Sequence, residues 1–153
     1  MSFEAKLREL GYDVPAANLD GGKIMGAVRT GNLIYTSGQV SRWNGQEIFG
    51  KLGEDLTVEQ GYEAARLSTL SALSAIKTLA GGSLDNVVQF VKVLGMVNVG
   101  AGFDNTPAVI HGCSDLLLEV FGEAGRHARS AVGMTIPLNY AVEIEIIVEV
   151  KPL

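Results

Sequence analysis

Cysteine is almost absent from this chain, which limits both its structure and its chemistry. The single residue, Cys113, cannot form an internal disulfide and has no cysteine neighbour with which to bind a metal. The only histidines, His111 and His127, do not have the spacing of a metal-binding motif. We therefore expect no metal and no cofactor, and we expect Cys113 to pack as a small buried apolar side chain rather than to act as a reactive thiol.

Basic residues are also few, and long apolar runs are missing. The 12 Lys and Arg residues are outnumbered by 17 Asp and Glu residues, and no basic cluster interrupts this balance. Phosphate neutralisation supplies most of the affinity of nucleic-acid binders, so a nucleic-acid partner is not predicted. No run approaches the roughly 18 apolar residues of a membrane span, and "MSFEAKLREL" lacks the apolar core of a secretion signal. These absences favour a cytoplasmic protein without a membrane partner.

The length of 153 residues predicts one domain, residues 1–153, with a short helical extension at about residues 1–20. In this extension Ser2 is a suitable N-cap for a helix from Phe3 to about Leu10, which Gly11 would end.

Capping signals mark two longer helices. Thr57 and Gln60 have the spacing of a capping box and open a helix that Gly81 and Gly82 end. The second helix is predicted to start with Thr106 as N-cap and to continue to Gly122. Each helix has an apolar stripe that a sheet could cover.

The strands are marked by β-branched and alternating residues. We expect a hairpin within residues 23–39, a central strand at residues 86–97, and a final hairpin of residues 129–136 and 140–150. The Asn44-Gly45 pair predicts a further tight turn, beside Trp43, whose role stays open. These elements predict an α+β fold with one mixed β-sheet and the two main helices packed on one face.

The last strand leaves the other face of the sheet to be explained. From Tyr140 to Val150, apolar residues alternate with a set that includes Glu143, Glu145 and Glu149. If residues 129–136 form a hairpin with this strand, Arg129 shares a face with the carboxylates. One interpretation is an ion pair on a solvated surface. The other is a pocket in which Arg129 binds a carboxylate while a glutamate acts as a general base, because small residues such as Ala131 leave room above the sheet.

Four segments carry a family resemblance. "GNLIYTSGQV", "GGSLDNVVQFVKV", "ARSAV" and "VEIEIIVEV" occur in the order and at roughly the spacing seen in the YjgF/RidA family, also called the L-PSP endoribonuclease group. The resemblance covers about residues 20–150. It implies a chorismate-mutase-like fold, assembled as a homotrimer with clefts between subunits, in which a neighbouring copy covers the open face.

The resemblance also implies an activity and site residues. Members of the RidA type hydrolyse reactive 2-imino or 2-enamino acids to 2-keto acids and ammonia. The arginine that holds the substrate carboxylate corresponds to Arg129, and the glutamate that positions the attacking water corresponds to Glu143. The glycine whose backbone lies near the ligand corresponds to Gly38. Ser114 and His111 are both candidates for the family asparagine, and Glu145 is either an assistant or a structural charge.

Three positions depart from the family pattern. Ile24 stands where a tyrosine is common, Ala131 where a cysteine is common, and His127 where a proline precedes the A-R pair. His127 lies two residues from Arg129 and could reach the same cleft, whereas His111 is expected to be partly buried or at an interface. The chain thus resembles a distinct subgroup of the family.

Three functions follow from these observations. The first is an enamine/imine deaminase, a hydrolase acting on a small carboxylate-bearing metabolite. The second is a non-catalytic trimeric protein that binds such carboxylates or regulates in response to them, and Ile24 favours it. The third is an endoribonuclease, which the acidic balance and the lack of a histidine pair disfavour.

Overall fold

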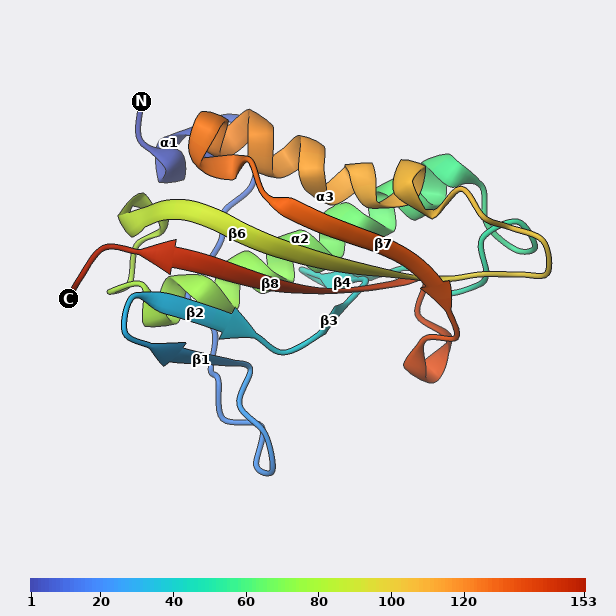
Figure 1. Cartoon of the computed structure of the whole chain (residues 1–153), viewed down its shortest axis with the longest axis horizontal. Coiled ribbons are helices and arrows are strands. Elements are labelled where there is room, and N and C mark those ends of the chain that lie inside the picture. The colour runs from blue at the N-terminus through green and yellow to red at the C-terminus, as the bar shows by residue number, and fades with distance from the viewer.

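The main sheet of the computed structural model, which describes residues 1–153, is built from six strands (Figure 1). Along the sheet the order is β1-β2-β8-β6-β7, and the short β3 also pairs with β8. The strands are β1 (Ala27–Thr30), β2 (Leu33–Thr36), β3 (Gln39–Val40), β6 (Val87–Asn98), β7 (Ala128–Met134) and β8 (Val142–Val150). A separate small hairpin is formed by β4 (Arg42–Trp43) and β5 (Gln46–Glu47), joined by the predicted turn.

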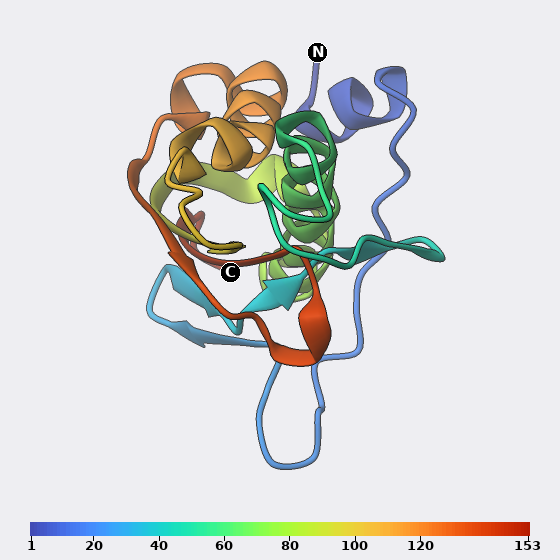
Figure 2. The same cartoon turned by 90° about the vertical axis from the view of Figure 1, so that its right-hand side faces the viewer.

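Two long helices, α2 (Val58–Leu79) and α3 (Thr106–Phe121), pack side by side on the same face of this sheet (Figure 2). The N-terminal helix α1 (Phe3–Glu9) lies at one end of α3. Single turns of 3₁₀-helix follow at η1 (Leu84–Asn86), η2 (Gly122–Gly125) and η3 (Pro137–Asn139). The predicted α+β architecture, with one mixed sheet and two main helices on one face, is therefore confirmed.

The core lies between the helices and this face of the sheet. In β8 the even-numbered residues Val142 to Val150 are at most 1% exposed, whereas Glu145 and Glu149 on the other face are exposed. Strand alternation accounts for this difference, because successive side chains point to opposite faces. Cys113 of α3 is fully buried among these apolar residues, as predicted.

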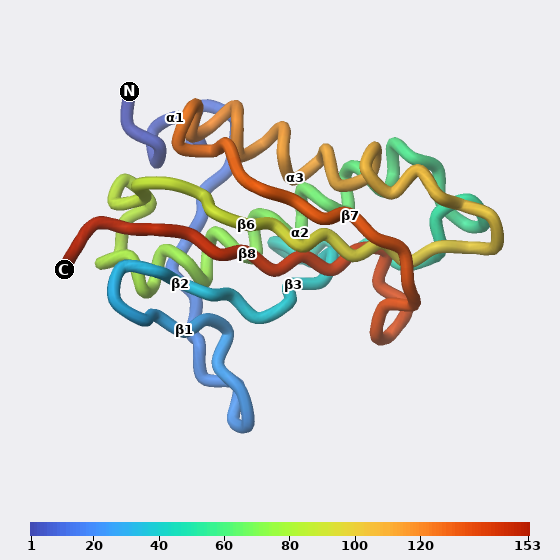
Figure 3. Tube along the Cα trace, in the orientation of Figure 1, coloured from blue at the N-terminus to red at the C-terminus, as the bar shows by residue number.

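The predicted final hairpin is wrong. β7 pairs in parallel with β6, and β8 pairs with β6 from its other side in the antiparallel sense, so β6 separates the two strands. The chain trace runs from β6 through α3 to β7, as Figure 3 shows. A helical crossover of this kind is the usual connection between parallel strands. Residues 137–139 therefore cross the end of the sheet instead of forming a tight turn, and Leu138 and Asn139 adopt positive φ angles of 58° and 62°.

The helix starts agree with the capping signals at two of three positions. Ser2 caps α1, and the Thr57 hydroxyl and the Gln60 side chain form the complete capping box of α2. At α3 the prediction is off by one residue: Asn105 is the cap and Thr106 is the first helical residue. The Thr106 hydroxyl instead donates to the Ala131 carbonyl at 2.9 Å and so ties α3 to β7.

The N-terminal extension covers the outer side of α2. The Ser74 hydroxyl donates to the Pro15 carbonyl, and the amide of Ala17 donates to the Thr78 hydroxyl. This cover explains why residues all around the middle of α2 are buried, beyond the single stripe that its periodicity predicts. Neither α2 nor any other helix has the length and apolar character needed to cross a membrane.

Candidate functional site

Arg129 projects from β7 toward α3, on the helical face of the sheet. Its partner across the β6–β7 ladder is the fully buried Val93, which fixes the face on which Arg129 lies. One guanidinium nitrogen, Nη1, donates to Nδ1 of His111 at 3.0 Å and to Oγ of Ser114 at 3.1 Å. Because a guanidinium can only donate, Nδ1 of His111 is the acceptor. Arg129 forms no ion pair with any carboxylate in the chain.

Ser114 connects Arg129 to the second histidine. Its hydroxyl lies 2.9 Å from Nε2 of His127, and Nδ1 of His127 lies 2.7 Å from the Gly125 carbonyl. A carbonyl only accepts, so Nδ1 carries the proton and, in the neutral ring, Nε2 accepts from Ser114. The hydroxyl then uses a lone pair to accept from Arg129, and the chain of hydrogen bonds holds the guanidinium in one position.

Burial supports the neutral form of His127. Desolvation lowers the pKa of His127 below its usual value, and the positive charge of Arg129 acts in the same direction, while the hydrogen bond to Gly125 opposes them. In front of these side chains lies a cavity of about 350 Å³, which is lined mostly by polar residues. The guanidinium is thus available to an anionic ligand and is supported from behind by neutral groups.

Glu143 lies on the other face of the sheet, beside Gly38. A Cβ atom added to Gly38 would overlap the Glu143 carboxylate, so the glycine makes the space that this carboxylate occupies. Desolvation raises the pKa of Glu143, and repulsion from the Glu145 carboxylate raises it further. A carboxylate with a raised pKa accepts a proton more readily at neutral pH, as a general base requires.

The structure brings some predicted residues together and separates others. Arg129, Ser114, His111 and His127 form one group, and Glu143, Gly38 and Glu145 form another. The two groups lie on opposite faces of the sheet, since Glu143 alternates with the buried Val142 and Ile144. The predicted shared face of Arg129 and the carboxylates is therefore wrong within one chain, because it depended on the hairpin that β6 interrupts.

The remaining predicted positions lie outside both groups. Ile24 is 67% exposed in the loop before β1, which projects away from the domain (Figure 2). Ala131 lies on the same face of β7 as Arg129, and its carbonyl accepts a hydrogen bond from the Thr106 hydroxyl. Glu149 is exposed at the far end of β8. No three His, Cys, Asp or Glu side chains lie close enough together to hold a metal ion.

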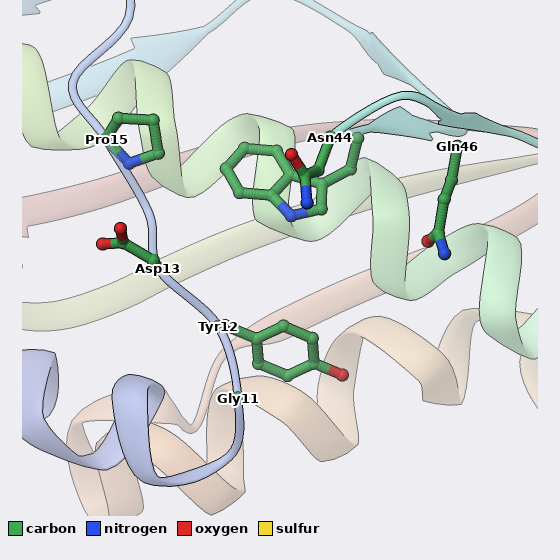
Figure 4. A pocket seen from close by; sticks show the side chains of 7 residues that line it. Gly11, Tyr12, Asp13, Pro15, Asn44 and Gln46 are labelled. Atoms are coloured by element: carbon green, nitrogen blue, oxygen red, sulfur yellow. The ribbon is translucent and has the colours of Figure 1, made fainter.

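A larger hollow, of about 580 Å³, lies between the N-terminal extension and the β4–β5 hairpin. Tyr12, Asn44 and Gln46 line it, as Figure 4 shows. Trp43 of the hairpin lines it as well. Its one ionisable carboxylate, Asp13, is exposed, and the Tyr12 hydroxyl accepts hydrogen bonds from Arg66. Trp43 also packs against the core, so this surface anchors the extension and offers no pair of groups for catalysis.

Two features of the Arg129 site were missed from the sequence. The first is the contact between Ser114 and His127, which depends on β7 lying beside α3. The spacing of His127, just before β7, and Arg129 within it was the available signal, because alternation in an extended segment places both side chains on one face. The second is Asp115 and Arg126, which line the same cavity but belong to no motif.

Comparisons with known proteins agree with this geometry. Residues 4–150 match the model of the YjgF/chorismate mutase-like family, whose description also names an endoribonuclease activity. Protein TCP17 of Trypanosoma cruzi is 40% identical over 150 residues, which cover 96% of this chain and 93% of that protein.

Solved structures give the same result. Atu1372 of Agrobacterium tumefaciens, described as having unknown function, has a TM-score of 0.89 at 36% identity and covers 98% of this chain and 94% of its own. A Shewanella oneidensis protein that carries the endoribonuclease designation has a TM-score of 0.90 at 34% identity, covering 98% of this chain and 100% of its own. With its fold, its motifs and these relatives in agreement, the chain belongs to the YjgF/chorismate mutase-like family, the L-PSP group.

Proposed function

We propose that this protein is an enamine/imine deaminase that hydrolyses a small 2-imino or 2-enamino acid to a 2-keto acid and ammonia. The observation that carries the proposal is the guanidinium of Arg129, which faces a polar cavity without a carboxylate partner in its own chain. Its planar fork fits a substrate carboxylate through two parallel hydrogen bonds. The alternative of a surface ion pair between Arg129 and a glutamate of β8 is excluded by the opposite faces on which they lie.

The reaction requires an anchored carboxylate and one activated water. Glu143 removes a proton from water, and the oxygen forms a bond to the imine carbon while the C=N electron pair moves to nitrogen, which takes up the proton that Glu143 received. The resulting carbinolamine loses ammonia and leaves the keto acid. An imine carbon is already electrophilic, so positioning and proton transfer supply much of the acceleration.

Arg129 and Glu143 can act on one substrate only if they come from different copies of the chain. The face that carries Glu143 supports such an assembly, since it also exposes a series of apolar side chains. Val28, Tyr35 and Met134 are 54%, 43% and 40% exposed on it. Several exposed apolar side chains on one face of a sheet are consistent with an interface between proteins. We therefore propose a homotrimer in which this face of one protomer meets the β7 edge of its partner.

Activity is tested by generating 2-iminobutanoate or 2-aminoacrylate in situ with a dehydratase and following keto-acid release. We expect clear acceleration over buffer at micromolar protein. Arg129→Ala should reduce kcat/KM by about 100-fold, because the anchoring of the carboxylate is lost. Arg42→Ala, which removes the same charge from the exposed β4, should change nothing. Carboxylate binding without turnover would instead favour a trimeric binding or regulatory protein.

Co-expression of two inactive variants tests whether each site is shared between protomers. In mixed trimers of Arg129→Ala and Glu143→Gln chains, about one quarter of the sites would contain both native residues if they come from different protomers. Activity should therefore return to about one quarter of the wild-type value. If both residues acted within one protomer, no mixed assembly would be active.

An endoribonuclease is the second candidate, because relatives carry that designation. The expected lack of a histidine pair is also wrong, since His111 and His127 both lie near Arg129. The hydrogen bonds disfavour this activity. Both ring nitrogens of His127 are engaged, by Ser114 and Gly125, so only His111 could exchange a proton with a bound phosphodiester. Cleavage of a defined RNA that disappears in His111→Ala would support this function, whereas cleavage that persists in this variant would point to a contaminating nuclease.

A further inference from the structure

The cavity in front of Arg129 is lined by positive charge, although the whole chain carries a net charge of −5. Arg126 and Arg129 both line it, and a guanidinium is permanently charged. Leu118 is the one apolar residue in its wall. A ligand with an apolar side chain would therefore make few apolar contacts in this cavity. A ligand with a second anionic group could pair that group with a guanidinium.

Asp115 is the one carboxylate in this wall, and a neighbour already engages it. The Tyr62 hydroxyl of α2 donates to Oδ2 of Asp115 at 2.8 Å, so this oxygen is directed toward the other helix. The hydrogen bond offsets part of the carboxylate charge that an incoming anion would meet. The positive potential of the two arginines is thus only partly cancelled.

Arg126 is available to a ligand. Its one ionic partner is Glu123, at 3.5 Å, and the two side chains are 71% and 88% exposed. Ion pairs as exposed as this one contribute little and exchange readily with other partners. The backbone at this position is nevertheless held, because the side-chain amide of Gln89 donates to the Arg126 carbonyl. The guanidinium is therefore exposed, while the backbone that carries it is held by Gln89.

The two arginines lie three residues apart, at the point where the chain enters β7. An extended segment of this length places their Cα atoms about 10 Å apart, and both residues line the same cavity. A ligand with two carboxylates separated by two or three carbon atoms would use both of these positive charges. A monocarboxylate would leave Arg126 without a ligand.

We propose that the substrate is a 2-imino or 2-enamino dicarboxylic acid, with its C1 carboxylate on Arg129 and its distal carboxylate on Arg126. This inference rests on the proposed function and specifies its substrate class. It assigns to Arg126 the role of a specificity-determining residue.

Calorimetry with 2-oxoglutarate and 2-oxopentanoate tests it. These product-like keto acids have the same number of carbons and differ in the distal carboxylate. The wild-type protein should bind 2-oxoglutarate about threefold to tenfold more tightly, as expected for one solvent-accessible charge pair. Arg126→Ala should abolish this preference and leave the affinity for 2-oxopentanoate within about twofold, whereas Arg42→Ala should retain the preference.

The outcomes separate this inference from the proposed function. Equal binding of the two acids to the wild type, or a preference that survives Arg126→Ala, would overturn the dicarboxylate assignment alone. Loss of both affinities in Arg129→Ala, together with the preference in wild type, would support both proposals. If neither acid binds to the wild-type protein, both proposals fail.

Discussion

Gly38 and Glu143 share one small volume: the carboxylate of Glu143 occupies the space in which a side chain at position 38 would begin. The colliding atoms are at the free end of a flexible side chain, so an added methyl group would displace the carboxylate and leave the backbone in place. The absence of a side chain at Gly38 therefore lets the Glu143 carboxylate take its observed position.

Gly38→Ala should leave the fold intact and lower kcat/KM of the deaminase reaction by about tenfold to 100-fold, because a small misplacement of a catalytic group is costly. The reference is the Glu143→Gln protein, in which the same substitution should cost no further activity. Equal losses in the two backgrounds would mean that Gly38 acts independently of Glu143.

Glu143→Gln should reduce deaminase turnover by about 100-fold to 10,000-fold, the usual contribution of a general base. The same substitution should increase the stability of the folded protein near neutral pH. Burial and Glu145 raise the pKa of Glu143, so the folded state favours the protonated form and loses stability as the pH rises above the ordinary value of 4.5. Thermal unfolding at pH 4 and pH 7 should show that the Tm of the variant, relative to that of the wild type, is higher at pH 7 than at pH 4. Glu149→Gln, at an exposed position on the same face of β8, serves as the control for the removal of one negative charge.

His127→Gln should make stability less sensitive to acid. Burial lowers the pKa of His127, so the folded state excludes a proton that the unfolded chain binds near pH 6.5. The wild-type protein therefore loses stability as the pH falls from 6.5 through the lowered pKa. Urea unfolding at pH 5 and pH 7.5 should give a smaller difference for His127→Gln than for the wild type. An unchanged difference would mean that another group is responsible.

Cys113 should be inert in the folded protein. It is fully buried, and desolvation raises the pKa of its thiol to about 12, so almost no reactive thiolate is present at pH 8. Iodoacetamide should label it stoichiometrically in guanidinium chloride and very slowly without denaturant. Rapid labelling of the native protein would show that α3 opens readily.

Local patterns predicted most of the fold. Alternation in residues 142–150 identified both faces of β8, and the capping box located the start of α2 to the residue. The pairing of β7 was missed because sequence proximity favours a hairpin, whereas the strand order depends on where α3 returns the chain. The succession of a strand, a helix and a strand over residues 87–134 is the pattern of a βαβ unit, which predicts the parallel pairing observed.

The assumed hairpin also explains why the site residues were identified but their relative positions were not. Arg129 and Glu143 were selected from motifs, but their relative placement followed the assumed hairpin and was wrong. Ser114 and His111 were both candidates for the counterpart of a family residue, and both form a hydrogen bond with Arg129. The bond of Ser114 to His127 joins residues 13 apart in the sequence and requires the helix and the strand to be packed first.

Because α3 connects β6 to β7, the two groups of candidate site residues also occupy separate segments of the sequence. Residues 106–134 form one uninterrupted segment that contains Arg129 and every side chain bonded to it, whereas Gly38 and Glu143 lie before and after it. Under the proposed function, mutation or recombination confined to this segment alters the carboxylate-binding residues and leaves the proposed water-activating residue unchanged. Ligand preference and hydrolytic chemistry can then diverge separately among descendants of one ancestor.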